Sequence, residues 1–160
     1  MKVLTIGFAR KSAQQFFELL RESGTKRILD VRLHNASQPD GFAKRVDLAW
    51  FARELCGIDY VHVPSLAPTK ELLSGNRQGR ISWDTYETRF NALMKERRIE
   101  STLSREDERD GCLLCSEDQP HHCHRRLVAK LLDRHWGKRA LACSSAAMKA
   151  SRALSGQSSC

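Results

Sequence analysis

The sequence predicts an α/β fold: a three-layer, open, mostly parallel sheet of four to five strands with helices on both faces. Short apolar or β-branched runs alternate along the 160 residues with longer stretches of helical periodicity. The run at 27–33, RILDVRL, has consecutive rather than alternating apolar residues, as a strand covered on both faces requires. With 41% apolar and 29% charged residues, the composition is that of a globular protein.

The N-terminal third gives the clearest local signals. Residues 2–8, KVLTIGF, predict a first strand that ends near Gly7. Residues 12–23 predict a helix that Ser12 caps and Gly24 ends.

Residues 34–45, HNASQPDGFAKR, predict a turn-rich loop of twelve residues, a length that suggests a functional role. A second helix and a third strand follow this loop. Residues 46–57 predict the helix, with Asp47 as its cap and Leu55 among its inward residues. Residues 58–64, IDYVHVP, predict the strand.

The second half is predicted to be mostly helical. Within 65–110, the stretch 82–97 carries a stripe at helical spacing (Tyr86, Phe90, Leu93 and Met94). Residues 111–115, GCLLC, predict a fourth strand, 120–136 a last long helix, and 139–143 a fifth strand. We expect a single α/β domain over 1–137, followed by a basic, Ser/Ala-rich tail over 138–160.

The charge of the chain limits its partners. The formal net charge is +8, and the segment 138–160 contributes four basic residues and no acidic one. This pattern is compatible with an anionic small molecule or nucleic acid as partner, and equally with a solvated basic surface. No apolar run is long enough to span a membrane, and the N-terminus lacks a signal-peptide pattern. The six cysteines therefore suggest reduced thiols and a cytoplasmic protein.

The polar and reactive residues gather at the ends of the predicted strands. In open parallel sheets, ligands bind beyond the carboxyl ends of the strands. The residues at those ends are Gly7, Asp30, Arg32, His62, Cys115 and Glu117. We therefore expect a pocket at that edge of the sheet.

The segment 112–125, CLLCSEDQPHHCHR, raises the question of a metal site. Cys112 and Cys115 form a C-x-x-C pair, but residues three apart on a strand point to opposite faces. A zinc knuckle needs both sulfurs to turn toward one point. We therefore predict no cofactor. A zinc or iron site remains an alternative, in which Cys115, Cys123, His121 and His124 converge across the loop.

A reactive thiol is the favoured interpretation of the same segment. Cys115 ends a strand and faces the start of the helix that follows Pro120, where the helix dipole and Arg125 favour a thiolate. Cys123 is a candidate resolving thiol, and His124 a candidate proton-transfer partner. The alternative for Cys115 is simple packing, because cysteine is among the most buried residue types.

Several stretches resemble the domain-of-unknown-function 488 family. They are TIG (5–7), DVR (30–32), GIDYVHVPSLAPTKELL (57–73), SWDTYETRF (82–90) and LLCSEDQPHHCHRRLVAKLL (113–132), with the signature C-S-E-x-x-P-x-x-C-H-R at 115–125. The resemblance covers about residues 2–137. It implies little about activity, because the family has no agreed function. The chain departs from the family after TIG, where Phe8 and Ala9 replace a frequent His-Ser pair. DVR and a later cysteine are also weakly similar to rhodanese-like domains, whose active loop has a different spacing.

These observations predict a cysteine-dependent transferase or hydrolase that acts on an anionic substrate, nucleotide-like or derived from nucleic acid. Cys115 would be the nucleophile or sulfur carrier, with Arg32 and Arg125 as anion clamps. The expected catalytic residues are Cys115, Glu117, His124 and Asp30, and the expected substrate-binding residues are Gly7, Arg32, His62, Arg125 and Cys123. The alternatives are a non-catalytic nucleic-acid or nucleotide-binding module and a metal-binding domain.

Overall fold

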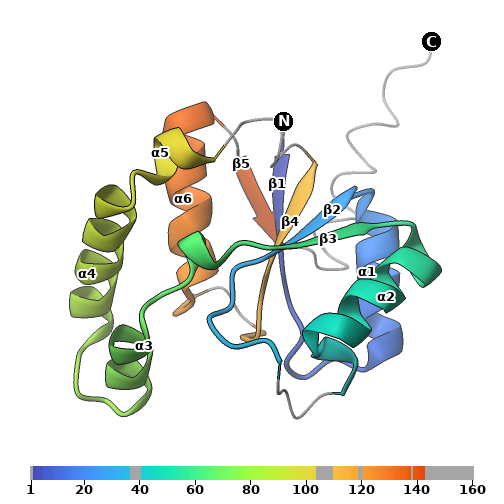
Figure 1. Cartoon of the computed structure of the whole chain (residues 1–160), viewed down its shortest axis with the longest axis horizontal. Coiled ribbons are helices and arrows are strands. Elements are labelled where there is room, and N and C mark those ends of the chain that lie inside the picture. Colours follow the sequence, from blue (N-terminus) through green and yellow to red (C-terminus); the bar gives the residue numbers. More distant parts are fainter. Residues whose placement is uncertain (1, 37–40, 104–109, 119–120, 138, 143–160) are drawn as a thin grey trace.

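The protein folds around a five-stranded parallel sheet with the strand order β3-β2-β4-β1-β5 (Figure 1). The computed structural model describes residues 2–36, 41–103, 110–118, 121–137 and 139–142. Its strands are β1 (Lys2–Gly7), β2 (Arg27–Asp30), β3 (Asp59–His62), β4 (Gly111–Cys115) and β5 (Arg139–Ala142). The predicted fold class is confirmed.

Helices cover both faces of this sheet, as Figure 1 shows. On one face lie α1 (Ala13–Ser23) and α2 (Arg45–Cys56); on the other lie α3 (Lys70–Arg77), α4 (Trp83–Glu96), α5 (Ile99–Thr102) and α6 (His124–Trp136). Two short 3-10 helices, Gly41–Ala43 and Pro64–Leu66, lie in the connections. Each face has its own apolar core, and the two cores stabilise the central strands from both sides.

Local capping explains where the first helices begin and end. Ser12 forms a capping box with Gln15, and Gly24 ends α1 in the left-handed conformation with φ of 70°, as predicted. The predicted cap of α2 is wrong: Lys44 is the N-cap, and Asp47 lies inside the first turn. A carboxylate there still stabilises the positive end of the helix dipole.

The predicted inward position of Leu55 is also wrong, since this side chain is 54% exposed. Helix α2 packs on β3, which is the edge strand of the sheet. Periodicity identifies the apolar stripe of a helix, but it does not show how far the sheet extends beneath it.

The register of the strands brings their carboxyl ends to one level. Gly7 pairs with Cys115, and Asp30 pairs with both His62 and Leu114. Because side chains alternate along β4, Cys112 packs in the core beneath α1 and α2, whereas Leu113 packs in the opposite core. Cys115 therefore belongs to the side covered by α3–α6.

The boundary predicted after residue 137 stays a prediction. Strand β5 brings 139–142 into the sheet beside β1, and 143–160, the rest of the predicted tail, lie outside the described residues. Within the described part of the chain, no helix has both the length and the apolar character needed to cross a membrane.

Candidate functional site

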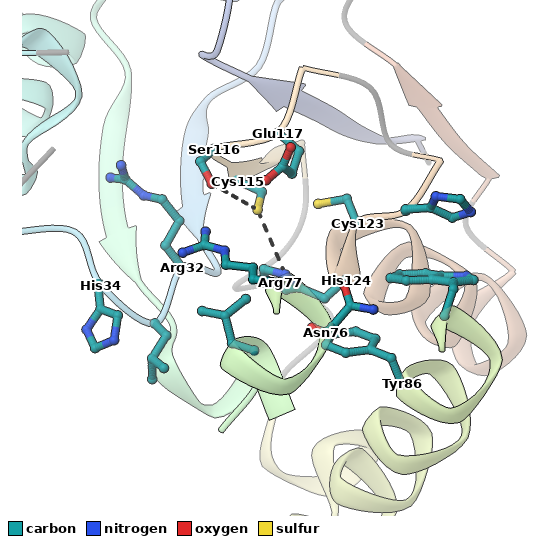
Figure 2. Close-up of a pocket in the computed structure, with 14 residues that line it drawn as sticks. Arg32, His34, Asn76, Arg77, Tyr86, Cys115, Ser116, Glu117, Cys123 and His124 are labelled. Carbon is teal, nitrogen blue, oxygen red and sulfur yellow. Dashed lines mark hydrogen bonds between the residues drawn. The ribbon is translucent and has the colours of Figure 1, made fainter. Parts of the chain in front are cut away.

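A pocket of about 370 Å³ opens at the carboxyl ends of β2 and β4, between these strand ends and helices α3, α4 and α6 (Figure 2). Its walls come from four segments far apart in the sequence. They are Arg32, Leu33 and His34 after β2; Leu73, Asn76 and Arg77 of α3; Trp83 and Tyr86 of α4; and Cys115, Ser116, Glu117, His122, Cys123 and His124 around β4 and the start of α6. The pocket therefore lies at the edge of the sheet where β2 and β4 end.

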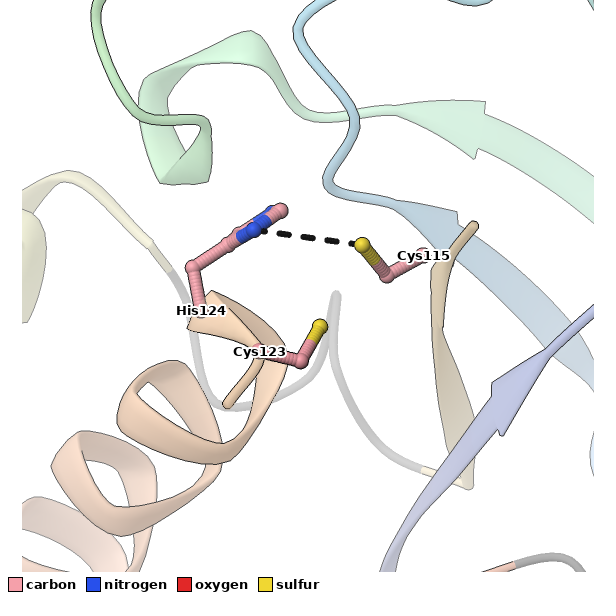
Figure 3. Close-up of side chains that lie close together, drawn as sticks. All are labelled: Cys115, Cys123 and His124. Carbon is pink, nitrogen blue, oxygen red and sulfur yellow. Dashed lines mark hydrogen bonds between the residues drawn. The ribbon is translucent and has the colours of Figure 1, made fainter. Parts of the chain in front are cut away.

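Cys115 and His124 face each other in this pocket. The Cys115 sulfur lies 3.8 Å from Nδ1 of His124, and both side chains are at most 6% exposed (Figure 3). Nε2 of His124 lies 2.8 Å from the carbonyl oxygen of Val31, which can only accept a hydrogen bond. Nε2 is therefore protonated, and Nδ1 is the nitrogen available to exchange a proton with the thiol.

Cys123 is the second thiol of the site. It is the N-cap residue of α6, is 2% exposed and directs its sulfur toward Cys115 (Figure 3). The two sulfurs and a ring nitrogen of His124 all lie within 4.8 Å of one another. These three groups, which we call the Cys-Cys-His cluster, are those in the described part of the chain that could ligate a metal ion together.

The thiols of the cluster differ in acidity. A hydrogen bond from Cys123 lowers the pKa of Cys115 well below its ordinary value, helped by His124 and opposed by burial. The same hydrogen bond, together with burial, raises the pKa of Cys123. Burial acts most strongly on His124 and lowers its pKa, but the negative charge of Cys115, the hydrogen bond to Cys115 and the hydrogen bond to the Val31 carbonyl together outweigh burial and raise that pKa. The opposite shifts of the Cys115 and His124 pKa values thus favour a Cys115 thiolate beside a His124 imidazolium.

Arg125 holds the segment that follows Cys115 through hydrogen bonds from its guanidinium. Its guanidinium is 1% exposed and donates hydrogen bonds to the carbonyl oxygens of Glu117 and Asp118, the latter at 2.8 Å. Gly7 lies against the same segment: a Cβ at this position would be 1.7 Å from the Glu117 carbonyl oxygen. Only glycine leaves room for this close approach of β1 to the Glu117 carbonyl.

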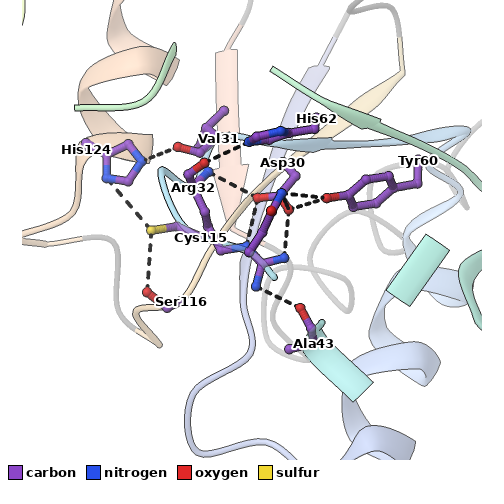
Figure 4. A network of polar contacts seen from close by, with 10 residues as sticks. Asp30, Val31, Arg32, Ala43, Tyr60, His62, Cys115, Ser116 and His124 are labelled. Carbon is purple, nitrogen blue, oxygen red and sulfur yellow. Dashed lines mark hydrogen bonds and ion pairs between the residues drawn. The ribbon is translucent and has the colours of Figure 1, made fainter. Parts of the chain in front are cut away.

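Asp30 and Arg32 form a buried ion pair beside the pocket (Figure 4). Arg32 donates from Nε at 2.8 Å and from Nη2 at 2.7 Å to the two carboxylate oxygens, and its Nη1 donates to the carbonyl of Ala43. Tyr60 and Asn35 also donate hydrogen bonds to Asp30. Asp30 is 0% and Arg32 3% exposed, so the pair fixes the turn after β2 from within the core.

The predicted site residues divide into three groups. Cys115, Cys123, His124, Glu117 and Arg32 line the pocket, although the Arg32 guanidinium is engaged by Asp30 and Ala43. Gly7 and Arg125 lie behind the segment at 116–118. Asp30 is internal, and His62 donates from Nε2 to the carbonyl of Arg32 at 3.0 Å.

The helical wall of the pocket was missed by the sequence analysis. Arg77 is exposed and lines the pocket, and its guanidinium forms no hydrogen bond or ion pair with the described residues. Tyr86 was placed in the helical stripe and is 2% exposed, yet it too lines the cavity. Nothing in the sequence around Arg77 distinguishes it from other exposed arginines. Tyr86 carries a weak signal, because a buried tyrosine needs somewhere polar to direct its hydroxyl.

The comparisons with known proteins agree with the sequence resemblance. No curated protein and no solved structure matches the chain significantly. The family described as "Domain of unknown function DUF488" matches residues 12–132, which include α1, the central strand and most of α6. The chain therefore belongs to the DUF488 family of domains of unknown function.

Proposed function

We propose that the protein is a thiol-dependent enzyme that acts on an anionic, nucleotide-like substrate in the pocket at the strand ends. The observation that carries this proposal is the 3.8 Å contact between the Cys115 sulfur and Nδ1 of His124 inside a cavity of about 370 Å³. A cysteine that serves packing alone needs neither an imidazole directed at its sulfur nor an open space in front of it.

The arrangement supports nucleophilic catalysis of a transferase or hydrolase type. The Cys115 thiolate attacks an electrophilic atom of the substrate, and a bond forms from sulfur to that atom. The leaving group departs with the electron pair of the broken bond and takes a proton from the His124 imidazolium. Neutral His124 then accepts a proton from the water or second acceptor that releases the group bound to sulfur. The Val31 carbonyl holds the ring in the required orientation throughout.

The walls of the pocket favour an anion. Arg77 supplies a cation that no described carboxylate neutralises, and the amide of Asn76 lies beside it on α3. Arg77 therefore takes the clamp role in this proposal more readily than Arg32, whose guanidinium is already paired. A phosphate or carboxylate held by one arginine is stabilised by roughly 1.5–3 kcal/mol.

Alkylation by iodoacetamide, followed by peptide mass spectrometry, tests the nucleophile. Cys115 is expected to react first among the six cysteines in the folded protein. His124→Gln keeps an N–H donor for the Val31 carbonyl but cannot exchange a proton, and it is expected to slow the reaction roughly 100-fold. The proposal fails if Cys115 reacts only when the protein unfolds, or if His124→Gln leaves its rate unchanged.

Binding of adenosine monophosphate, measured by calorimetry, tests the anion site separately. Arg77→Ala is expected to weaken binding about tenfold or more. Arg80→Ala is the matched control, because Arg80 is exposed nearby, donates to Ser74, and is not among the residues that line the pocket. Equal losses in both variants, or no binding to the wild type, would exclude the pocket as a nucleotide site.

A further inference from the structure

We infer that Cys115, Cys123 and His124 form a binding site for a thiophilic divalent cation, Zn²⁺ in the first place. This site does not rest on the proposed function, and a bound ion would occupy the same Cys115 thiolate that the proposed function uses as a nucleophile. The inference rests on the geometry of the three ligand atoms, on the contacts that orient them, and on their opening into the pocket.

The spacing of the ligand atoms suits tetrahedral zinc. With Zn–S bonds of about 2.3 Å and Zn–N bonds of about 2.0–2.1 Å, the ligand atoms of a tetrahedral site are roughly 3.5–3.8 Å apart. The Cys115 sulfur lies 3.8 Å from Nδ1 of His124, and no pair in the cluster is farther apart than 4.8 Å. Ligation therefore needs each pair to close by about 1 Å at most, a shift that side-chain rotation supplies.

The surroundings orient all three ligands. The Val31 carbonyl holds the proton on Nε2 of His124, so that Nδ1 is the nitrogen directed at the cluster and ligates the ion after giving up its proton. Cys115 is placed by the end of β4, and Cys123 by its position as the N-cap residue of α6. An outer contact like that of the Val31 carbonyl is typical of metal-binding histidines, and it exists here before any metal binds.

The composition of the cluster selects the cation. Two thiolates neutralise a dication, and the set of two sulfurs and one imidazole contains none of the oxygen ligands that Mg²⁺ and Ca²⁺ require. Cys112 is not part of the set, because it packs in the core on the opposite face of the sheet. The ligands are therefore not the C-x-x-C pair. One ligand, Cys115, comes from the end of β4, and the other two, Cys123 and His124, come from the start of α6.

A tetrahedral zinc ion with three protein ligands has one further coordination position. That position faces the pocket, because all three ligand residues line this cavity. Zinc sites of this kind are open to water or to another ligand, unlike closed structural sites. A zinc ion in the cluster uses the Cys115 sulfur as a ligand, so that metal binding and alkylation of Cys115 exclude each other.

Zinc binding to the full chain tests the inference directly. The background carries Cys143→Ser and Cys160→Ser, which remove two thiols outside the described residues. Reduced, metal-free protein is titrated with Zn²⁺ in competition with a chromogenic chelator, and one ion per chain is expected. Cys123→Ser should weaken binding by more than the roughly 10–100-fold loss that follows removal of an outer contact. Cys56→Ser, at a half-buried cysteine of α2, should not change it.

Two further measurements keep the test independent of any folding defect in a variant. Co²⁺ added to the unaltered protein should give visible bands of tetrahedral cobalt and an ultraviolet sulfur-to-cobalt charge-transfer band with the intensity of two thiolates. Saturating Zn²⁺ should protect Cys115 and Cys123, but not Cys56, from iodoacetamide. The inference is overturned by absent stoichiometric binding, by a cobalt spectrum without thiolate bands, or by zinc that binds equally well to folded Cys123→Ser protein.

Discussion

Gly7 and Arg125 approach so closely that a Cβ on Gly7 would lie 2.4 Å from Nη1 of Arg125. Gly7 ends β1, and Arg125 lies in the first turn of α6, so this contact joins two segments far apart in the sequence, next to the residues that follow Cys115. The packing of a glycine against a guanidinium thus holds Glu117 and Asp118, which follow the candidate nucleophile in the chain.

Gly7→Ala is predicted to destabilise the protein. The added methyl would overlap the Glu117 carbonyl and the Arg125 guanidinium, and overpacking of this kind costs about 1–3 kcal/mol or more of unfolding free energy. Urea denaturation measures the loss. Gly41→Ala is the control, because a Cβ there meets no atom within 4 Å. Equal stability of the two variants would contradict the close approach.

Asp30→Ala is predicted to be among the most destabilising changes near the site. It leaves the Arg32 guanidinium buried without its carboxylate and also removes the acceptor of Tyr60, a change that typically costs roughly 3–5 kcal/mol. The double variant Asp30→Ala/Arg32→Met should recover part of this loss, since no unpaired charge remains.

The control for this prediction is the exposed pair formed by Arg53 and Asp59, whose side chains are 74% and 60% exposed. Asp59→Ala should change the unfolding free energy by about 0–1 kcal/mol. A loss for Asp30→Ala as small as that for Asp59→Ala would show that the internal pair does not stabilise the fold.

Both tyrosines of the chain are predicted to ionise only when the protein unfolds. Burial, and then the hydrogen bond to Asp30, raise the pKa of Tyr60; burial, and then the nearby Cys123 and Cys115, raise that of Tyr86. Because folding raises these pKa values, the unfolded protein loses its tyrosine protons at lower pH than the folded protein does. The folded state is therefore stabilised fully below the ordinary pKa of 10.0 and becomes less stable as the pH rises above it. Tyrosinate absorbance should therefore appear together with the loss of circular dichroism at alkaline pH. A tyrosine that titrates near 10 in folded protein would contradict this.

The sequence was sufficient to predict the edge of the sheet at which the pocket forms. Alternation along 111–115 separated Cys112 from Cys115, and the rule that parallel strands deliver their ends to one side placed Cys115 near Arg32. These inferences need only the local period of the chain and one topological rule, and both hold in the structure.

The rest of the site depends on contacts between distant segments, and local patterns do not encode these. Asp30 is engaged by Tyr60 and Arg32 inside the core, a partnership that no spacing in the sequence reveals. Arg77 reaches the pocket because α3 packs beside α4, and no local pattern in the sequence indicates this position. Similarly, only three-dimensional packing shows that Arg125 supports the segment at 116–118 from behind.

The position of β4 has a consequence for biosynthesis. Strands β1 and β2 do not pair with each other, because β4 lies between them, although it is translated after both. Until residues 111–115 leave the ribosome, each earlier strand has an open edge, and the thiols at 115 and 123 follow immediately. The thiol pocket therefore cannot assemble until β4 and the start of α6 have both been made, and the sheet itself is completed later still, when β5 pairs with β1.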